Sequence, residues 1–94
     1  MDELDSPAIP NADSFSRSVA NLEIGQSVSM TRRIAHDDPE FQEVGAIKRK
    51  MRSTVDPIVS KAKNRFGRYY IVESGHYMTQ AAAVVAVVTA TRTA

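Results

Sequence analysis

The fold is decided by residues 38–67, which read DPEFQEVGAIKRKMRSTVDPIVSKAKNRFG. Asp38 is a typical N-cap residue and Pro39 suits the first helical position, so we expect a helix to begin at Asp38. Apolar residues then recur every three or four positions, close to the repeat of an α-helix. The apolar stripe consists of Phe41, Val44, Ile47, Met51, Val55, Ile58, Ala62 and Phe66. Because Gly67 is a typical helix terminator, the pattern predicts a long amphipathic helical segment that ends there.

Pro57 interrupts this segment, because proline lacks the backbone N–H group and crowds the carbonyl of Ser53. Ser53 or Thr54 would suit the cap of a second helix with Asp56 in its first turn. Against this, the apolar stripe keeps its phase through Pro57, which falls on the solvent side of the helix. We therefore expect either one kinked helix or two nearly coaxial helices.

Three further segments have the composition of β-strands. Residues 27–34 alternate apolar and polar side chains, which is typical of a half-buried strand. Residues 68–74 are aromatic and β-branched, and they precede Gly75 and His76, which we expect to begin a hairpin turn. Residues 81–93 are valine-rich with little alternation, as in a strand that is buried on both faces or lies centrally.

The order of these segments predicts an α+β fold of the β-α-β-β type. A small antiparallel sheet is packed on one face by the one long, kinked helix. So thin a sheet leaves its edge strands exposed, and exposed edges invite pairing with a second copy of the chain. We therefore expect a homodimer.

The N-terminal part of the chain differs in charge from the rest. Residues 1–24 carry five acidic residues against one arginine, which gives a charge of −4. We expect them to form an acidic, largely flexible arm on an α+β domain of residues 25–94. Three apolar residues in the arm have the spacing of two helical turns: Phe15, Val19 and Leu22. Asp13 or Ser14 would cap such a helix, and an extended tail is the alternative.

Composition excludes several classes of protein. The 94-residue chain has no cysteine, which excludes disulfides, thiolate metal sites and thiol nucleophiles and favours an intracellular protein. The first five residues are acidic and lack the pattern of a secretory signal. The most apolar stretch, residues 81–90, is about half the length that a membrane-spanning helix needs. We expect a cytoplasmic protein with no membrane partner.

Two clusters of polar residues have the composition of catalytic or metal sites. Residues 36–38, His-Asp-Asp, are better explained by helix capping, because a metal site needs three or four converging ligands and His76 is the only other histidine. Glu73, Ser74 and His76 do not converge on one point, because they are near neighbours in one strand and turn. The glycines are isolated, so no phosphate-binding loop is present. We expect no enzymatic activity, no cofactor and no metal.

Positive charge is concentrated in residues 48–68, which carry eight basic residues against Asp56, a charge of +7. The basic residues are Lys48, Arg49, Lys50, Arg52, Lys61, Lys63, Arg65 and Arg68. A solvated helix face normally alternates charges of both signs, whereas acids are nearly absent here. The segment therefore predicts contacts with nucleic-acid phosphates, with a solubilising or protein-facing surface as the alternative. Tyr69, Tyr70 and Tyr77 suit either base stacking or cross-strand packing.

A resemblance to a known group of proteins covers about residues 22–92. The opening LEIGQSV of residues 22–28, the basic middle and the RYYIVE of residues 68–73 before a valine-rich strand resemble small bacteriophage-encoded accessory proteins. The resemblance implies a non-enzymatic role in the cytoplasm of an infected bacterium, on nucleic acid or on a host protein. It assigns no functional residues.

These observations predict a small regulatory protein that contacts DNA or RNA phosphates through its basic helix. The alternative is an inhibitor or adaptor that binds a host protein through the acidic arm or through a sheet edge.

Overall fold

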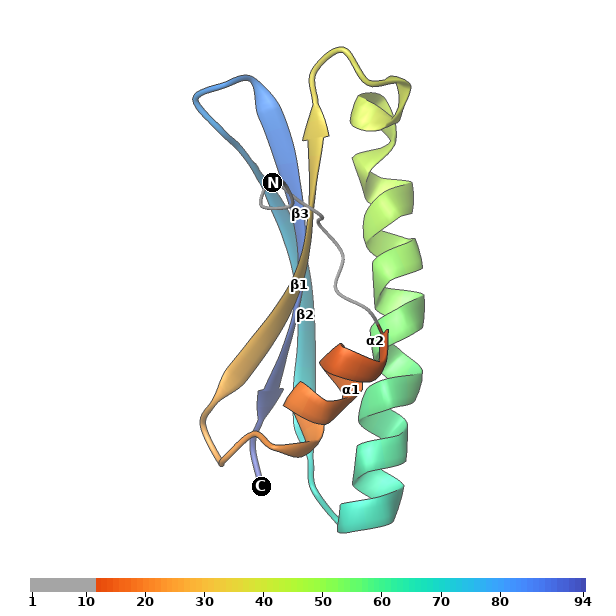
Figure 1. Cartoon of the computed structure of the whole chain (residues 1–94), viewed down its shortest axis with the longest axis vertical. Coiled ribbons are helices and arrows are strands. Elements are labelled where there is room, and N and C mark those ends of the chain that lie inside the picture. The colour runs from red at the N-terminus through yellow and green to blue at the C-terminus, as the bar shows by residue number, and fades with distance from the viewer. Residues whose placement is uncertain (1–11) are drawn as a thin grey trace.

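The computed structural model describes residues 12–94, so residues 1–11 of the predicted arm lie outside the described part. Along the chain the elements are α1 (Ala12–Ala20), β1 (Ser27–Ala35), the 3₁₀ helix η2 (Pro39–Glu43), α2 (Val44–Phe66), β2 (Tyr70–Met78) and β3 (Ala83–Arg92). Figure 1 shows the long helix α2 lying along a twisted sheet. The predicted α+β class, with a small antiparallel sheet and one long helix, is confirmed.

The sheet has the strand order β1-β3-β2, and both pairings are antiparallel. The valine-rich segment thus forms the central strand, as predicted, with β1 and β2 on either side. Even-numbered residues of all three strands face the helices. Met30, Val88 and Ser74 lie in one row, and Val28, Ala90 and Val72 lie in the next row over the core. Odd-numbered residues point to the opposite side of the sheet.

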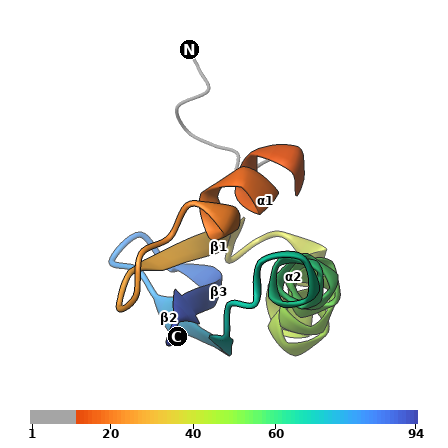
Figure 2. The same cartoon turned by 90° about the horizontal axis from the view of Figure 1, so that it is seen from below.

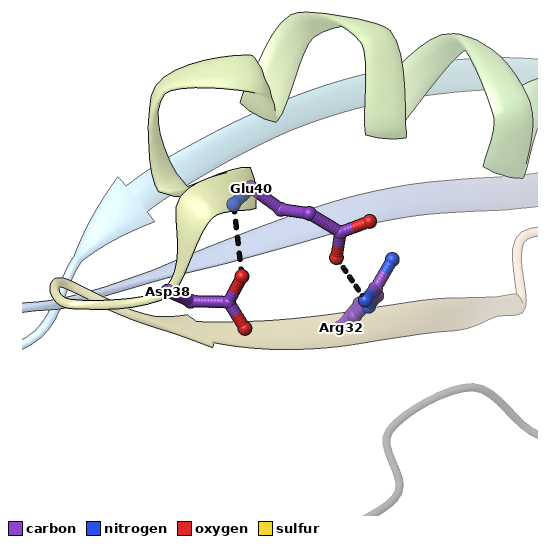
Figure 3. A network of polar contacts seen from close by, with 3 residues as sticks. All are labelled: Arg32, Asp38 and Glu40. Atoms are coloured by element: carbon purple, nitrogen blue, oxygen red, sulfur yellow. Dashed lines mark hydrogen bonds and ion pairs between the residues drawn. The ribbon is translucent and has the colours of Figure 1, made fainter.

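The helical segment begins at Asp38, as the sequence predicts. The Asp38 carboxylate accepts a hydrogen bond of 2.8 Å from the backbone N–H of Glu40, and Pro39 occupies the first helical turn. The Glu40 carboxylate in turn forms an ion pair with Arg32 of β1 (Figure 3). This pair lets the half-buried Arg32 lie on the helix-facing side of the strand. Because the first turn is a 3₁₀ helix, the α-helix itself starts only at Val44.

Helix α2 is continuous through Pro57, which settles the choice that the sequence left open. Pro57 lies on the exposed side, where the lost backbone hydrogen bond leaves the Ser53 carbonyl accessible to water. The helix ends at Gly67, whose φ of 67° is left-handed and whose N–H donates a 2.9 Å hydrogen bond to the Lys63 carbonyl. This termination is the one expected from the Phe66-Gly67 step.

The predicted hairpin turn at Gly75-His76 is wrong. Strand β2 continues through both residues, and Gly75 pairs with Val87 in the middle of the sheet. The turn lies instead at residues 79–82, which read TQAA. The backbone N–H of Thr79 donates 2.8 Å to the Ala83 carbonyl, and its Oγ1 accepts a hydrogen bond from the Ala83 N–H. Thr79 therefore closes the turn with its side chain, without the glycine or proline that marks most turns.

Helix α1 belongs to the packed domain, which differs from the predicted arm of residues 1–24. Phe15 is 2% exposed and Val19 is fully buried, because both lie between α1 and the core formed by α2 and the sheet. Figure 2 shows α1 and α2 on the same side of the sheet. Leu22 is buried as well, so the chain joins the core ten residues or more before the predicted boundary at residue 25.

Three hydrogen bonds fasten the end of α1 to the sheet. The Tyr70 hydroxyl donates 3.1 Å to the Val19 carbonyl, and the Arg92 Nη1 donates 3.0 Å to the Leu22 carbonyl. The Arg68 guanidinium donates to the carbonyl of Ala20. The Val19 and Ala20 carbonyls belong to the last turn of α1, where a helix leaves carbonyls without i+4 partners, and Leu22 follows the helix. Within residues 12–94, neither helix is long and apolar enough to cross a membrane.

Candidate nucleic-acid interface

Helix α2 carries seven of the eight predicted basic residues, and Arg68 follows it directly. They form two groups separated by residues 53–60, a stretch without basic side chains. The N-terminal cluster consists of Lys48, Arg49, Lys50 and Arg52, and the C-terminal cluster consists of Lys61, Lys63, Arg65 and Arg68. At about 1.5 Å per residue, Arg52 and Lys61 are about 14 Å apart along the helix axis. The eight basic residues therefore form two separate clusters along α2 and its C-terminal end, and they do not form one continuous patch.

The charge of α2 is almost uncompensated. Its only acidic residue is Asp56, whose carboxylate lies 3.7 Å from the Arg52 Nε. This is the one ion pair of the helix within the described residues 12–94. The other basic side chains of α2 are exposed or half-exposed. These side chains form no ion pair within the described residues, so their charges are available to a polyanion.

The C-terminal cluster includes two exposed aromatic rings. Phe66 and Tyr69 are 49% and 53% exposed at the corner between α2 and β2. The Lys63 Nζ lies 5.2 Å from the centre of the Tyr69 ring, and the Arg68 guanidinium lies 5.0 Å from that of Phe66. These distances are typical of cation–π contacts. The rings thus hold part of the positive charge in place and still offer exposed faces.

A groove of about 150 Å³ runs between α1 and α2 beside this cluster. Its lining residues are Ser16, Arg17, Ala20, Ile58, Lys61, Ala62, Arg65 and Phe66. The lining contains three cations and no acidic residue, and the rest is largely apolar. Such a groove suits an anion with an apolar or planar part, such as a phosphate next to a sugar or base.

Arg17 is the functional candidate that sequence reasoning missed. In the sequence Arg17 is the single basic residue of an acidic segment, whereas the packing of α1 places it with Lys61 and Arg65 in the lining of the groove. The helical spacing of Phe15 and Val19 was the available signal, since it implies that α1 packs on the core.

Arg68 and the tyrosines have structural partners. The Arg68 guanidinium donates to the Ala20 carbonyl and stacks on Phe66, which fixes its position. Tyr70 faces the helices and bonds to α1, whereas Tyr77 is on the opposite side of the sheet and Tyr69 precedes β2. The three tyrosines therefore do not share a face, and only Tyr69 adjoins the basic cluster.

The polar sets weighed as catalytic remain dispersed. Asp38 is occupied as a helix cap. Glu73 and His76 belong to opposite sides of the sheet by their register. Among residues 12–94, no three histidine, aspartate or glutamate side chains are grouped so that they could hold a metal ion.

Comparison with known proteins adds the family of the chain. Neither a search of the curated proteins nor a search of the solved structures found a match. A protein-family profile does match residues 13–94, which include α1 and every element of the sheet. The chain thus belongs to the family described as Domain of unknown function (DUF7609).

Proposed function

We propose that the protein is a small, non-enzymatic nucleic-acid-binding protein that contacts phosphates through α2. The observation that carries the proposal is the charge of this helix, which has seven basic residues and one acid. Counterion release on binding favours association with DNA or RNA and needs no base-specific contact. The proposed setting is cytoplasmic and regulatory. The resemblance to bacteriophage accessory proteins supports that setting, and a phage origin remains a prediction.

The spacing of the two basic clusters favours a duplex. They lie about 14 Å apart along the helix axis, whereas the major groove of B-DNA is about 12 Å wide. With α2 laid across the groove, each cluster reaches the phosphates of one strand. The groove between α1 and α2 adds Arg17 to the second contact.

The test is a binding titration with duplex and single-stranded DNA at several salt concentrations. If about four phosphates are neutralised, affinity falls about 100-fold between 50 and 200 mM salt. Duplex is expected to bind more tightly than single strand. Affinity that stays flat with salt, or no binding at all, contradicts the proposal.

Cluster variants locate the contact. Replacing Lys48, Arg49, Lys50 and Arg52 by alanine is expected to reduce the salt slope and to weaken binding equally for all sequences. Replacing Lys61, Lys63 and Arg65 has the same expected effect, and Arg68 is left intact because it holds α1. Arg33→Ala removes an exposed cation on the other side of the sheet and is expected to leave the salt slope of the monomer unchanged.

A second candidate, an adaptor that binds a host protein, is favoured by the exposed apolar surface of β2. Ile71, Tyr77 and Met78 are 54%, 57% and 58% exposed on this edge strand. A partner strand added to β2 would cover part of this surface. If a partner is captured from nuclease-treated lysate and is lost when residues 1–11 are deleted, the binding site lies in these residues and not on β2. Deleting residues 1–24 is unsuitable, because it removes the buried α1.

A further inference from the structure

One side of the sheet is bare in the described part of the chain. Both helices pack on the same side, and no element of residues 12–94 covers the other (Figure 2). The register arranges this open face in rows of three residues, one from each of β1, β3 and β2. The rows are Arg33-Val85-Tyr77, Thr31-Val87-Gly75, Ser29-Thr89-Glu73 and Ser27-Thr91-Ile71.

The two charges in these rows are placed symmetrically. Arg33 on β1 and Glu73 on β2 lie in the rows on either side of Val87, at diagonally opposite corners. With strands about 4.8 Å apart and residues about 3.3 Å apart along a strand, the two Cα atoms are about 16 Å from each other. They form no ion pair within the described chain. A cation and an anion so arranged are complementary to the same pattern on another copy.

We propose that the open face binds the open face of a second copy, with the two-fold axis near Val87. A two-fold interface must be complementary to itself, because every contact occurs twice. The two-fold axis runs along the diagonal between the other two corners of these rows, Ser29 and Tyr77. Arg33 of each copy then faces Glu73 of the other copy. The strands of the two sheets then cross at nearly a right angle, which is one of the two common ways in which sheets pack.

Gly75 contributes to the shape complementarity of the two faces, because it has no side chain. An added Cβ at this position would have no atom within 4 Å, so a notch lies beside Val87. In the diagonal arrangement this notch lies opposite the second copy's Val85, the residue next to Val87 on the same side of β3, which is 8% exposed. The apolar centre and the charged corners therefore fit at the same time.

The size of the face sets the strength of the association. Three strands are about 14 Å wide, so two such sheets that cross at nearly a right angle overlap over about 200 Å² of flat area per copy, or about 400 Å² for the pair. Specific interfaces of standard size bury about 1,600 Å² in total, so this dimer is a weak one. We expect a dissociation constant of roughly 1–100 μM.

The test is sedimentation equilibrium of the full chain, without nucleic acid, at concentrations from roughly 1 μM to 1 mM. The unchanged chain is expected to form a reversible dimer. Arg33→Glu and Glu73→Arg each replace two attractive contacts by two repulsive ones, and each is expected to weaken dimerisation about 10- to 30-fold. The double variant restores both pairs and is expected to return to within about threefold of the unchanged chain.

Two matched controls and one shape variant complete the design. Arg49→Glu and Glu43→Arg make the same charge changes on exposed residues of the helical side, and they are expected to leave dimerisation unchanged. Gly75→Leu fills the notch and is expected to weaken the dimer; its Cβ would meet no atom of the monomer within 4 Å. A chain that stays monomeric at all concentrations overturns the proposal. So does a dimer that is insensitive to the single reversals or is not rescued by the double one, since edge pairing or another surface then holds it together.

Discussion

Ala82 has a backbone conformation that is sterically unfavourable for any residue with a Cβ atom. Its φ of 59° lies in the left-handed region, which costs an alanine about 1 kcal/mol relative to glycine. The position is enforced because Thr79 must close the turn onto Ala83 and because the Ala82 N–H donates 3.1 Å to the Thr79 carbonyl. The turn therefore stores a small strain that a substitution can remove.

We predict that Ala82→Gly stabilises the protein. Relief of the strain, reduced by the greater freedom of glycine in the unfolded chain, leaves a gain of about 0.5 kcal/mol. For a domain of this size, that raises the melting temperature by about 2–4 °C. Ala81→Gly is the control, because Ala81 has no positive φ, and it is expected to melt slightly lower than the parent. A lower melting temperature for Ala82→Gly would contradict the prediction.

Gly67 provides the converse case. Its φ of 67° turns the chain out of the helix directly after its N–H has bonded to the Lys63 carbonyl, and a Cβ would meet no neighbouring atom. Gly67→Ala is therefore expected to lose about 1 kcal/mol from backbone strain alone. Gly67→Asn should lose less, since asparagine tolerates the left-handed conformation. Denaturant unfolding of both variants measures the difference, and equal losses would point to a cause other than φ.

Among the elements, α2 is unusual because it contains a proline in its interior. The helix is continuous through Pro57, so Pro57→Ala restores a hydrogen bond from residue 57 to the Ser53 carbonyl. We expect the free energy of unfolding to rise by about 1–3 kcal/mol.

Pro39→Ala is the matched control for this variant. Pro39 lies in the first helical turn, where no backbone donor is lost, so its replacement is expected to bring no gain. Thermal melting distinguishes the two substitutions. A loss of more than about 2 kcal/mol for Pro57→Ala would mean that the proline is needed for the packing of α2.

How far sequence predicts each element depends on whether its signals are local. The start and end of the helical segment were predictable because Asp38 and Gly67 act through their own backbone geometry. The central position of β3 was predictable because residues 83–88 are apolar at every position, without the alternation of a half-buried edge strand. The turn at residues 79–82 was not, since its cap is a threonine side chain and its left-handed residue is an alanine.

The candidate site follows the same rule. The basic residues of α2 are visible in sequence because helix and charge are both local properties. The groove was not predictable, because Arg17 reaches it only through the packing of α1 on α2. Nor was the engagement of Arg68 by the Ala20 carbonyl, a contact across 48 residues of chain.

At the scale of the whole molecule, α1 decides how much of the chain is one cooperative unit. Phe15→Ala removes a buried ring from the contact between α1 and the core and is expected to cost about 3–5 kcal/mol. That is a large share of the stability of a chain of this length. Ser18→Ala, on the exposed side of α1, is expected to change stability by less than about 0.5 kcal/mol. If chemical denaturation finds only a small loss in the free energy of unfolding for Phe15→Ala, α1 does not unfold cooperatively with the rest of the domain.

The central position of β3 also has a consequence for how the chain is made. Strands β1 and β2 do not pair with each other, and within the sheet each is hydrogen-bonded only to β3, with Ser27 paired to Thr91 across 64 residues. Synthesis proceeds from the N-terminus, so β1, α2 and β2 are all made before the strand that joins them. Until residues 83–92 leave the ribosome, the sheet is not formed and the apolar stripe of α2 stays exposed. Chaperone binding or rapid completion of the chain would limit aggregation at this stage.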